Sequence, residues 1–391
     1  MQPALVNRFR GLNNTDDSVR LGLSWQSQAD NLLVTNDGAL MRRNGYTLAA
    51  AGAFTGAYSM RDYTRMYVVN GTDLQRVAPD LTLTTIRSGL QPLEMHWTEV
   101  NKDVYFTNGV DSGIIHGDDS VTDWSWPAPT APTLARGQGS LPAGLYRAVT
   151  TYLLPDGRET GSSTHTDIEL PEDSSLLLSD IPITAGVTTL LYISPADSPV
   201  FGFAGVMTSP SYAWSAGPDS LGAELTNLTL NPLPPGAIYP TAWKGRIYAA
   251  QHSPQTDTTA VWFSEPLGFH LFALEKNFFQ VPGLVTMMAP AEDALVVATH
   301  ERIYAYADNK LEVLAKYGVP PGNAWAMDDD DSVLFWSKRG VCRAMPFMNL
   351  TEDRVSVAPG AAAGAALLRH KGQKHFIATL RLGGAAFNNR S

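Results

Sequence analysis

The sequence predicts an all-β protein: a β-propeller interrupted by an inserted β-sandwich of the fibronectin type III or immunoglobulin kind. Three observations predict this. Short strand-like runs dominate the chain, they recur at about forty residues, and two proline-rich stretches enclose a region with a different spacing. The 391 residues include 33 glycines and 26 prolines, which supply many turns, and the 44% hydrophobic content is enough for packed cores.

The predicted strands are rich in aromatic and β-branched side chains and are flanked by turn formers. They lie at 66–69, 104–106, 189–193, 247–250, 295–299 and 333–336. The best helical candidate is residues 361–369 (AAAGAALLR), although Gly360 and Gly364 weaken it. We therefore expect a chain that is mostly β.

Several of these runs resemble one another. Residues 64–71 and 102–109 each combine a charged turn, a hydrophobic strand and Asn-Gly, a pair that favours two-residue hairpins with positive φ at both central positions. Met66 precedes Val104 by 38 residues, close to the repeat of about 40–45 residues in WD40-type propeller blades. The alternative is another all-β protein, because hairpins of this chemistry look alike.

The regular spacing stops between Trp126 and Ala242. Residues 127–133 (PAPTAPT) and 232–240 (PLPPGAIYP) predict extended spacers, because proline fixes φ and restricts the preceding residue. The stretch between them has the size and strand spacing of a sandwich. Its predicted strands are 145–153, 165–170, 175–179 and 188–193. The expected domains are residues 1–126, the first part of the propeller; 127–239, the sandwich; and 240–391, the remaining propeller and a C-terminal tail.

The charge follows the same division. The formal net charge of −10 divides into −4 for residues 1–126, −7 for 127–239 and +1 for 240–391. A basic surface for binding duplex DNA is therefore not expected.

The single cysteine, Cys342, has no internal disulfide partner, and no apolar run approaches the roughly 20 residues of a membrane span. The N-terminal stretch lacks the apolar segment of a signal peptide, so we expect a soluble protein without a membrane anchor.

No sequence motif of a known enzyme class occurs, so neither catalysis nor a metal or other cofactor is expected. One alternative is a glycosidase, which would need paired carboxylates converging in a central pocket. Asp293, Glu301 and Asp353 are the candidates, but the sequence does not place them relative to one another.

The highest concentration of charge is an acidic run, Asp328, Asp329, Asp330 and Asp331. It is either a solvated turn or an acidic surface facing DNA that slides past, because fixed carboxylates repel the phosphate backbone. Two pairs of bases, Arg42-Arg43 and Lys338-Arg339, stand shortly before glycine turns. They are interpreted as solvated hairpin tips, with salt bridges between subunits as the alternative.

Several short motifs follow one another along the chain. They are residues 9–14 (FRGLNN), 38–46 (GALMRRNGY), 142–152 (PAGLYRAVTTY), 261–266 (VWFSEP) and 335–340 (FWSKRG). In this order the motifs resemble the opening segment, the inserted sandwich and the return to the propeller of virion propeller proteins of tailed bacteriophages. That family comprises the tail nozzle (tail tubular protein B) and the packaged-DNA-stabilisation, head-completion proteins.

This resemblance implies a non-catalytic structural protein of the virion tail, made in the host bacterial cytoplasm. It implies a homo-oligomeric ring, commonly of six subunits, below the portal and adaptor and in contact with other tail proteins. Viral double-stranded DNA would pass through the ring without specific binding during ejection. The alternative function is a receptor- or glycan-binding tail module that uses the sandwich. Its candidate contacts, if exposed, are Phe201, Phe203, Tyr212 and Trp214.

Overall fold

The computed structural model describes residues 6, 8–35, 37–45, 47–328, 330–358, 360–370 and 372–381. Throughout this part of the chain the regular structure is β, apart from one short 3-10 turn, η1 (Pro218–Ser220). The strands form many small open sheets, nearly all of them antiparallel. The expectation of an all-β protein is confirmed.

Five of these sheets, together called the five-sheet body, are built from strands that follow one another in the chain. The first is β5 (Phe54–Ser59), β6 (Met66–Asn70), β7 (Asp73–Val77) and β8 (Leu83–Arg87). The second is β9 (His96–Val100), β10 (Asp103–Thr107), β11 (Ser112–Ile115) and β12 (Val121–Thr122). The third is β20 (Ile238–Trp243), β21 (Arg246–Ser253), β22 (Thr258–Glu265), β23 (Gly268–Phe272) and β24 (Phe278–Pro282).

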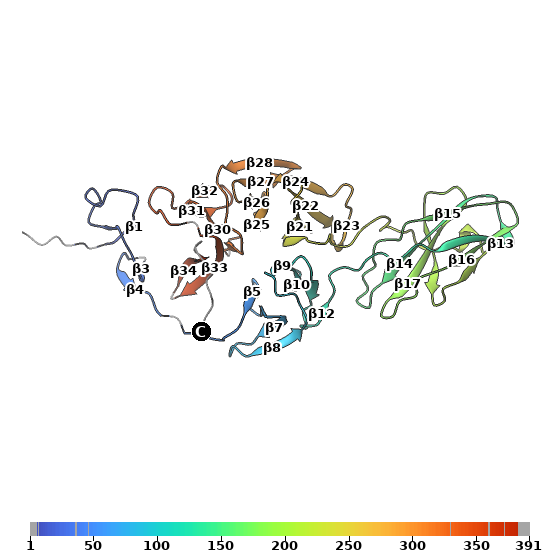
Figure 1. Cartoon of the computed structure of the whole chain (residues 1–391), viewed down its shortest axis with the longest axis horizontal. Coiled ribbons are helices and arrows are strands. Elements are labelled where there is room, and N and C mark those ends of the chain that lie inside the picture. Colours follow the sequence, from blue (N-terminus) through green and yellow to red (C-terminus); the bar gives the residue numbers. More distant parts are fainter. Residues whose placement is uncertain are drawn as a thin grey trace, which may run out of the picture.

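The fourth sheet is β25 (Val285–Pro290), β26 (Leu295–Thr299), β27 (Ile303–Ala307) and β28 (Lys310–Ala315). The fifth is β29 (Trp325–Met327), β30 (Val333–Ser337), β31 (Gly340–Arg343) and β32 (Met348–Asn349). Figure 1 shows the sheets arranged around a common centre, with β5 and β25 inside and β8 and β28 outside. The short hairpins in the sequence therefore produce local meanders, whose faces pack against the neighbouring sheets.

Each pair of consecutive sheets shares a buried cluster. Tyr67 of the first sheet packs with Phe106 of the second, and Tyr105 of the second packs with Phe272 of the third. Similar clusters join the third sheet to the fourth and the fourth to the fifth. Within the described residues, no such cluster joins the fifth sheet back to the first. The body therefore has a seam between its first and last sheets.

The best helical candidate, residues 361–369, is not a helix: from Ala362 on, this segment belongs to strand β33 (Ala362–His370), paired antiparallel with β34 (Gln373–Arg381). The backbone N–H of Ala363 donates to the carbonyl of Pro321 at 2.9 Å, which fixes β33 beside the fifth sheet. Ala363 is buried there. This packing and hydrogen bonding outweigh the modest helix propensity of an alanine-rich run.

The two Asn-Gly pairs do lie in hairpin connections, but the predicted turn geometry is wrong. Asn70 pairs with Asp73, so the two loop residues are Gly71 and Thr72 rather than Asn70 and Gly71. Of the Asn-Gly pair only Gly71 has positive φ. The Asn70 side chain instead accepts a hydrogen bond from the backbone N–H of Ala53, which keeps it in the strand.

Between the second and third sheets the chain forms a separate two-sheet unit, the inserted unit. One sheet is β13 (Thr133–Leu141), β16 (Ser174–Ser179) and β19 (Tyr212–Trp214). The other is β15 (Thr166–Leu170), β14 (Gly144–Leu153), β17 (Thr188–Ser194) and β18 (Gly202–Met207). A core that includes Tyr146, Leu176 and Trp214 joins the two sheets. Figure 1 shows this unit projecting from the five-sheet body.

The inserted unit is fastened to the five-sheet body by Arg158, in the turn after β14. Its guanidinium donates to the carbonyl of Asp123 at 2.7 Å and to the carbonyl of Trp124, and Asp156 accepts from its Nε at 2.8 Å. Nearby, His270 Nε2 donates to the Glu159 carbonyl at 2.9 Å. The charge-assisted contacts of Arg158, together with the His270 hydrogen bond, hold the two units in one orientation.

Replacing Arg158 by alanine should loosen this joint without unfolding either unit. Each hydrogen bond from a charged group contributes about 1.5–3 kcal/mol, and the loss falls on the joint rather than on a core. We expect a larger radius of gyration in small-angle scattering and faster proteolysis within residues 127–132. Arg136→Ala, at an exposed position in β13, is the matched control. Unchanged scattering and proteolysis for Arg158→Ala would show that other contacts hold the units.

The chain before the first sheet, called the N-terminal arm (described residues of 8–50), has little core of its own. It contains β1 (Gly11–Leu12), β2 (Trp25–Gln26), β3 (Leu32–Val34) and β4 (Leu40–Arg42). Among its described residues only Asn13 and Gly38 are buried, while the Val19 and Leu48 side chains are 89% and 81% exposed. The arm reaches the rest of the chain where Asn14 Nδ2 donates to the Ser356 carbonyl at 2.8 Å.

Candidate functional sites at opposite ends of the sheets

The acidic run predicted from the sequence forms the loop between β29 and β30. Asp328, Asp330 and Asp331 are described, while Asp329 lies outside the described residues. The Asp328 N–H donates to the Ser332 carbonyl at 2.8 Å and closes the turn. Asp330 accepts hydrogen bonds from Ser332, and these lower the pKa of its carboxyl group. Hydrogen bonds within the turn therefore hold its backbone and keep the Asp330 carboxylate ionised at neutral pH.

Two carboxylates of this loop are paired with bases from distant parts of the chain. Asp328 Oδ1 lies 2.6 Å from Lys374 Nζ on β34, and Asp331 forms an ion pair with Arg61 in the β5–β6 turn. The loop thus lies at the seam and bridges it. Sequence reasoning missed both bases, because they lie 46 and 270 positions away. The orientation of the run towards DNA stays a prediction, but these pairs reduce the negative charge it presents.

The aromatic side chains proposed as glycan contacts lie mainly within the inserted unit. Phe201 and Trp214 are buried, and Phe203 packs edge-on against Tyr192 with ring centroids 5.6 Å apart. Tyr212 is half-buried against the core. The exposed aromatic surface that would favour glycan binding is therefore not formed by these four residues.

The three carboxylates considered for a glycosidase are not brought together. Asp293 precedes β26 and Glu301 follows it, so they lie at opposite ends of one strand. Asp353 lies beyond β32, near the N-terminal arm, where its carbonyl accepts a hydrogen bond from Thr15.

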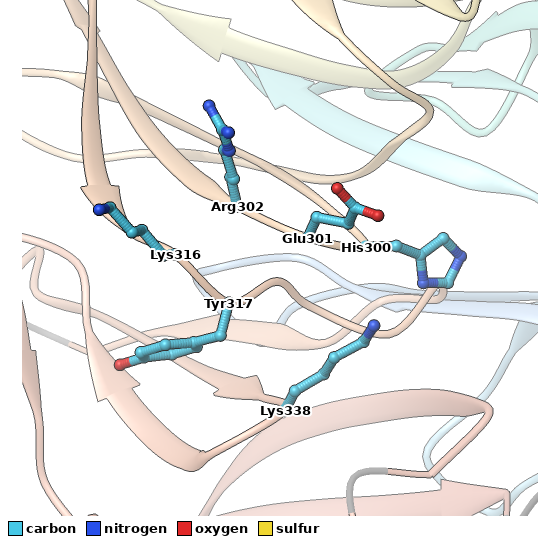
Figure 2. Close-up of a pocket in the computed structure, with 6 residues that line it drawn as sticks. All are labelled: His300, Glu301, Arg302, Lys316, Tyr317 and Lys338. Atoms are coloured by element: carbon cyan, nitrogen blue, oxygen red, sulfur yellow. The ribbon is translucent and has the colours of Figure 1, made fainter.

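A cleft of about 440 Å³ opens at the end of the fourth and fifth sheets away from the acidic loop (Figure 2). Three connections supply its walls: the β26–β27 turn, the segment after β28 and the β30–β31 turn. It is called the basic cleft. Its lining residues are His300, Glu301, Arg302, Lys316, Tyr317 and Lys338.

The two sheets approach each other so closely at the basic cleft that only glycine fits at position 318. A Cβ on Gly318 would lie 2.0 Å from the Thr299 carbonyl oxygen. Backbone hydrogen bonds fix this approach: Val319 N–H donates to Thr299 O, and Lys338 N–H donates to Gly318 O, both at 2.9 Å. The position of Lys338 relative to the β26–β27 turn is therefore set by the backbone.

The basic cleft carries an excess of positive charge. Among the described residues, no carboxylate forms an ion pair with Arg302, Lys316 or Lys338. The surrounding protein and the charge of Lys338 lower the pKa of His300, so this imidazole is neutral at pH 7. Glu301 supplies one opposing charge. Figure 2 shows the three cationic side chains extending from different connections around Tyr317.

One half of the Lys338-Arg339 pair is engaged within the chain. The Arg339 guanidinium lies 4.9 Å from the centre of the Tyr317 ring and 3.0 Å from Glu352 Oε1. Lys338 is left facing the cleft. The sequence singled out this pair of bases and, separately, Glu301, but no motif connects them with each other or with the remaining residues of the cleft.

Two further kinds of site were sought in the described part of the chain. It contains no group of three or more His, Cys, Asp or Glu side chains placed to hold a metal ion. Within the same residues, no helix has the length and apolar character needed to cross a membrane.

Comparison with known proteins gives no family for this chain. No family model matches it, and no curated protein matches it. Among solved structures, the extracellular domain of a hybrid two-component system protein from B. thetaiotaomicron aligns with 78% of this chain and 33% of its own, at 9% identity and a TM-score of 0.31. Porphyromonas gingivalis dipeptidyl peptidase 4 aligns with 80% of this chain and 45% of its own, at 9% identity and a TM-score of 0.27. The chain thus spans less than half the length of either structure.

Proposed function

We propose that the chain is a structural protein of a bacteriophage virion, located in the head-to-tail or tail nozzle region. In this proposal the five-sheet body is a β-propeller and the inserted unit is a fibronectin-like sandwich. Five meander sheets around a common centre support the first assignment, and two sheets packed over one core support the second. The order of the sequence motifs supports the location.

The single observation that carries an assembly role is the N-terminal arm. Ordering a residue costs roughly 1–2 kcal/mol in backbone entropy, and buried apolar surface normally offsets that cost. The arm has almost no such surface, and it exposes Val19 and Leu48. A surface on another molecule would supply the missing burial. In a subunit ring that molecule is the next copy, because contacts between different surfaces close by rotation.

The proposed partners are further copies of the chain, forming a ring of six, together with the portal, the adaptor and other tail proteins. Viral double-stranded DNA would pass along the axis without specific binding, as the net charge of −10 favours. The receptor-binding alternative lacks comparable support, because Phe201 and Trp214 are core residues.

Electron microscopy and mass photometry of the purified chain test this proposal. We expect rings with a central hole and a mass near six times 42.3 kDa. Removing residues 1–50 should leave folded monomers, since the five-sheet body and the inserted unit have their own cores. Dispersed full-length monomers that bind neither each other nor virion proteins would overturn the proposal.

Replacing the four aspartates at 328–331 by lysines should leave the protein folded but slow genome release. Both ion pairs of the loop have a solvent-exposed base, Arg61 or Lys374, and ion pairs open to solvent contribute little to stability, so the thermal midpoint should shift by only a few degrees. The new cations would attract DNA phosphates instead of repelling them. Ejection is measured by DNA release from virions carrying the variant. Unchanged kinetics would remove the proposed DNA-facing role of this loop.

A further inference from the structure

The inserted unit carries an acidic end, remote from its joint with the five-sheet body. Residues 127–239 contain 3 basic and 10 acidic residues. Arg158 and the joint lie at the end where β14 stops, whereas Gly144 at its start pairs with Leu170 at the end of β15. The turns gathered at that remote end, 142–143, 171–173 and 195–201, contain no lysine or arginine.

Four exposed carboxylates belong to this end and are called the acidic tip: Glu169, Glu172, Asp173 and Asp197. Register places Glu169 opposite Leu145, and Asp197 Oδ1 accepts a hydrogen bond from the Leu145 N–H at 3.2 Å. Within the described residues, none of the four forms an ion pair. Arg147, on β14, donates to the Ser198 carbonyl, and its Nε lies 3.8 Å from Asp167 Oδ2.

We infer that the basic cleft of one copy binds the acidic tip of the next copy. The inference rests on the proposed subunit ring and names one of its contacts. The cleft presents three bases, Arg302, Lys316 and Lys338, that have no ion-pair partner among the described residues. The acidic tip presents four carboxylates that likewise form no ion pair within the described residues. The two surfaces have opposite charge, and opposed potentials across an interface fix register and exclude wrong partners.

The two surfaces do not meet within one chain. Figure 1 places the end of the inserted unit bearing β13 and β16 far from β27 and β31, which border the cleft. A contact between them therefore joins two copies through different surfaces, which is the type of contact that closes a ring.

An acidic partner fits the basic cleft better than nucleic acid does. Duplex DNA would have to approach a chain of net charge −10, in which the bases of the cleft form only a small patch. DNA binding is nevertheless a measurable outcome of the experiment below.

Charge reversal on each surface tests the contact in the full-length protein. The cleft variant is Lys316→Glu with Lys338→Glu, and the tip variant is Glu172→Lys with Asp173→Lys. All four positions are exposed, so folding should be retained, as circular dichroism would verify. We expect each variant alone to assemble at least about tenfold more weakly by mass photometry, because like charges then face each other. The chain carrying all four changes should assemble again, since the charges are complementary with reversed sign.

The control changes two exposed lysines outside the cleft, Lys276→Glu and Lys310→Glu, which alters net charge equally. If both charge-reversed variants form rings as readily as the wild type does, the inferred contact is overturned while the proposed ring stands. A wild-type chain that stays monomeric would overturn both. Loss of binding to a labelled DNA duplex in the cleft variant, with assembly unchanged, would assign the cleft to nucleic acid instead.

Discussion

Gly318→Ala should destabilise the protein by about 3 kcal/mol or more, enough to unfold or disorganise the fourth and fifth sheets. The added methyl group would lie 2.0 Å from Thr299 O and 2.2 Å from the carbonyl carbon of His300, well inside van der Waals contact. Both are backbone atoms, and the Val319–Thr299 hydrogen bond holds them in place. Overpacking of this kind usually costs about 1–3 kcal/mol, and more when the backbone cannot move.

Urea denaturation followed by tryptophan fluorescence measures this loss. Gly117→Ala is the matched control, because its added methyl group would have no atom within 4 Å beyond its chain neighbours, and the φ of Gly117 is not positive. The control should change the free energy of unfolding by less than about 0.5 kcal/mol. Equal midpoints for both variants would mean that the two sheets are farther apart than described, and the shape of the basic cleft would need revision.

Lowering the pH from 7 to 4 should cost about 3 kcal/mol of folding free energy through His96 alone. This imidazole is buried, with its ring centre 4.2 Å from that of Tyr239. Burial lowers its pKa to about 4 from the usual 6.5, so the folded state keeps it neutral. Between pH 6.5 and about 4, His96 is protonated in the unfolded chain but stays neutral in the folded chain. Each unit of difference between the two pKa values corresponds to about 1.4 kcal/mol of folding free energy. The contribution is therefore present above pH 6.5 and is lost as the pH falls towards 4.

His96→Phe isolates this contribution, because it keeps a ring against Tyr239 and removes the titration. Other groups, including Glu94 with its raised pKa, titrate in both proteins and cancel in the difference. The pH dependence of the free energy of unfolding should be flatter in the variant by about 3 kcal/mol over this interval. Parallel pH profiles would show that the imidazole is hydrated rather than buried.

Strand positions could be predicted from the sequence because each depends on a few adjacent residues. The run at 295–299 is hydrophobic, has polar turn formers on both sides and became β26 with the predicted bounds. The alanine-rich segment 361–369 suggests a helix for the same reason. Its strand conformation depends on hydrogen bonds to Pro321 and Asn323, some forty residues earlier in the chain. Local propensity carries no information about such contacts.

The candidate sites were harder to predict than the strands. Asp331 was recognisable as part of an acidic run, but its partner Arg61 is distant in sequence and has no distinguishing motif. The basic cleft combines three connections whose proximity follows from packing at Gly318. Lys338 stood out in the sequence as part of a pair of bases and Glu301 as a candidate carboxylate, but nothing brought the two together. A charged site built from separate turns is visible only after the sheets are placed.

The seam makes the boundary between the first and fifth sheets different from the other boundaries of the five-sheet body. Four of its boundaries between consecutive sheets are sealed by buried side chains, whereas the boundary beside the acidic loop is bridged by solvent-exposed ions. Salt weakens such ions but leaves apolar packing largely intact. We therefore expect this boundary to respond to ionic strength more than the four packed boundaries do.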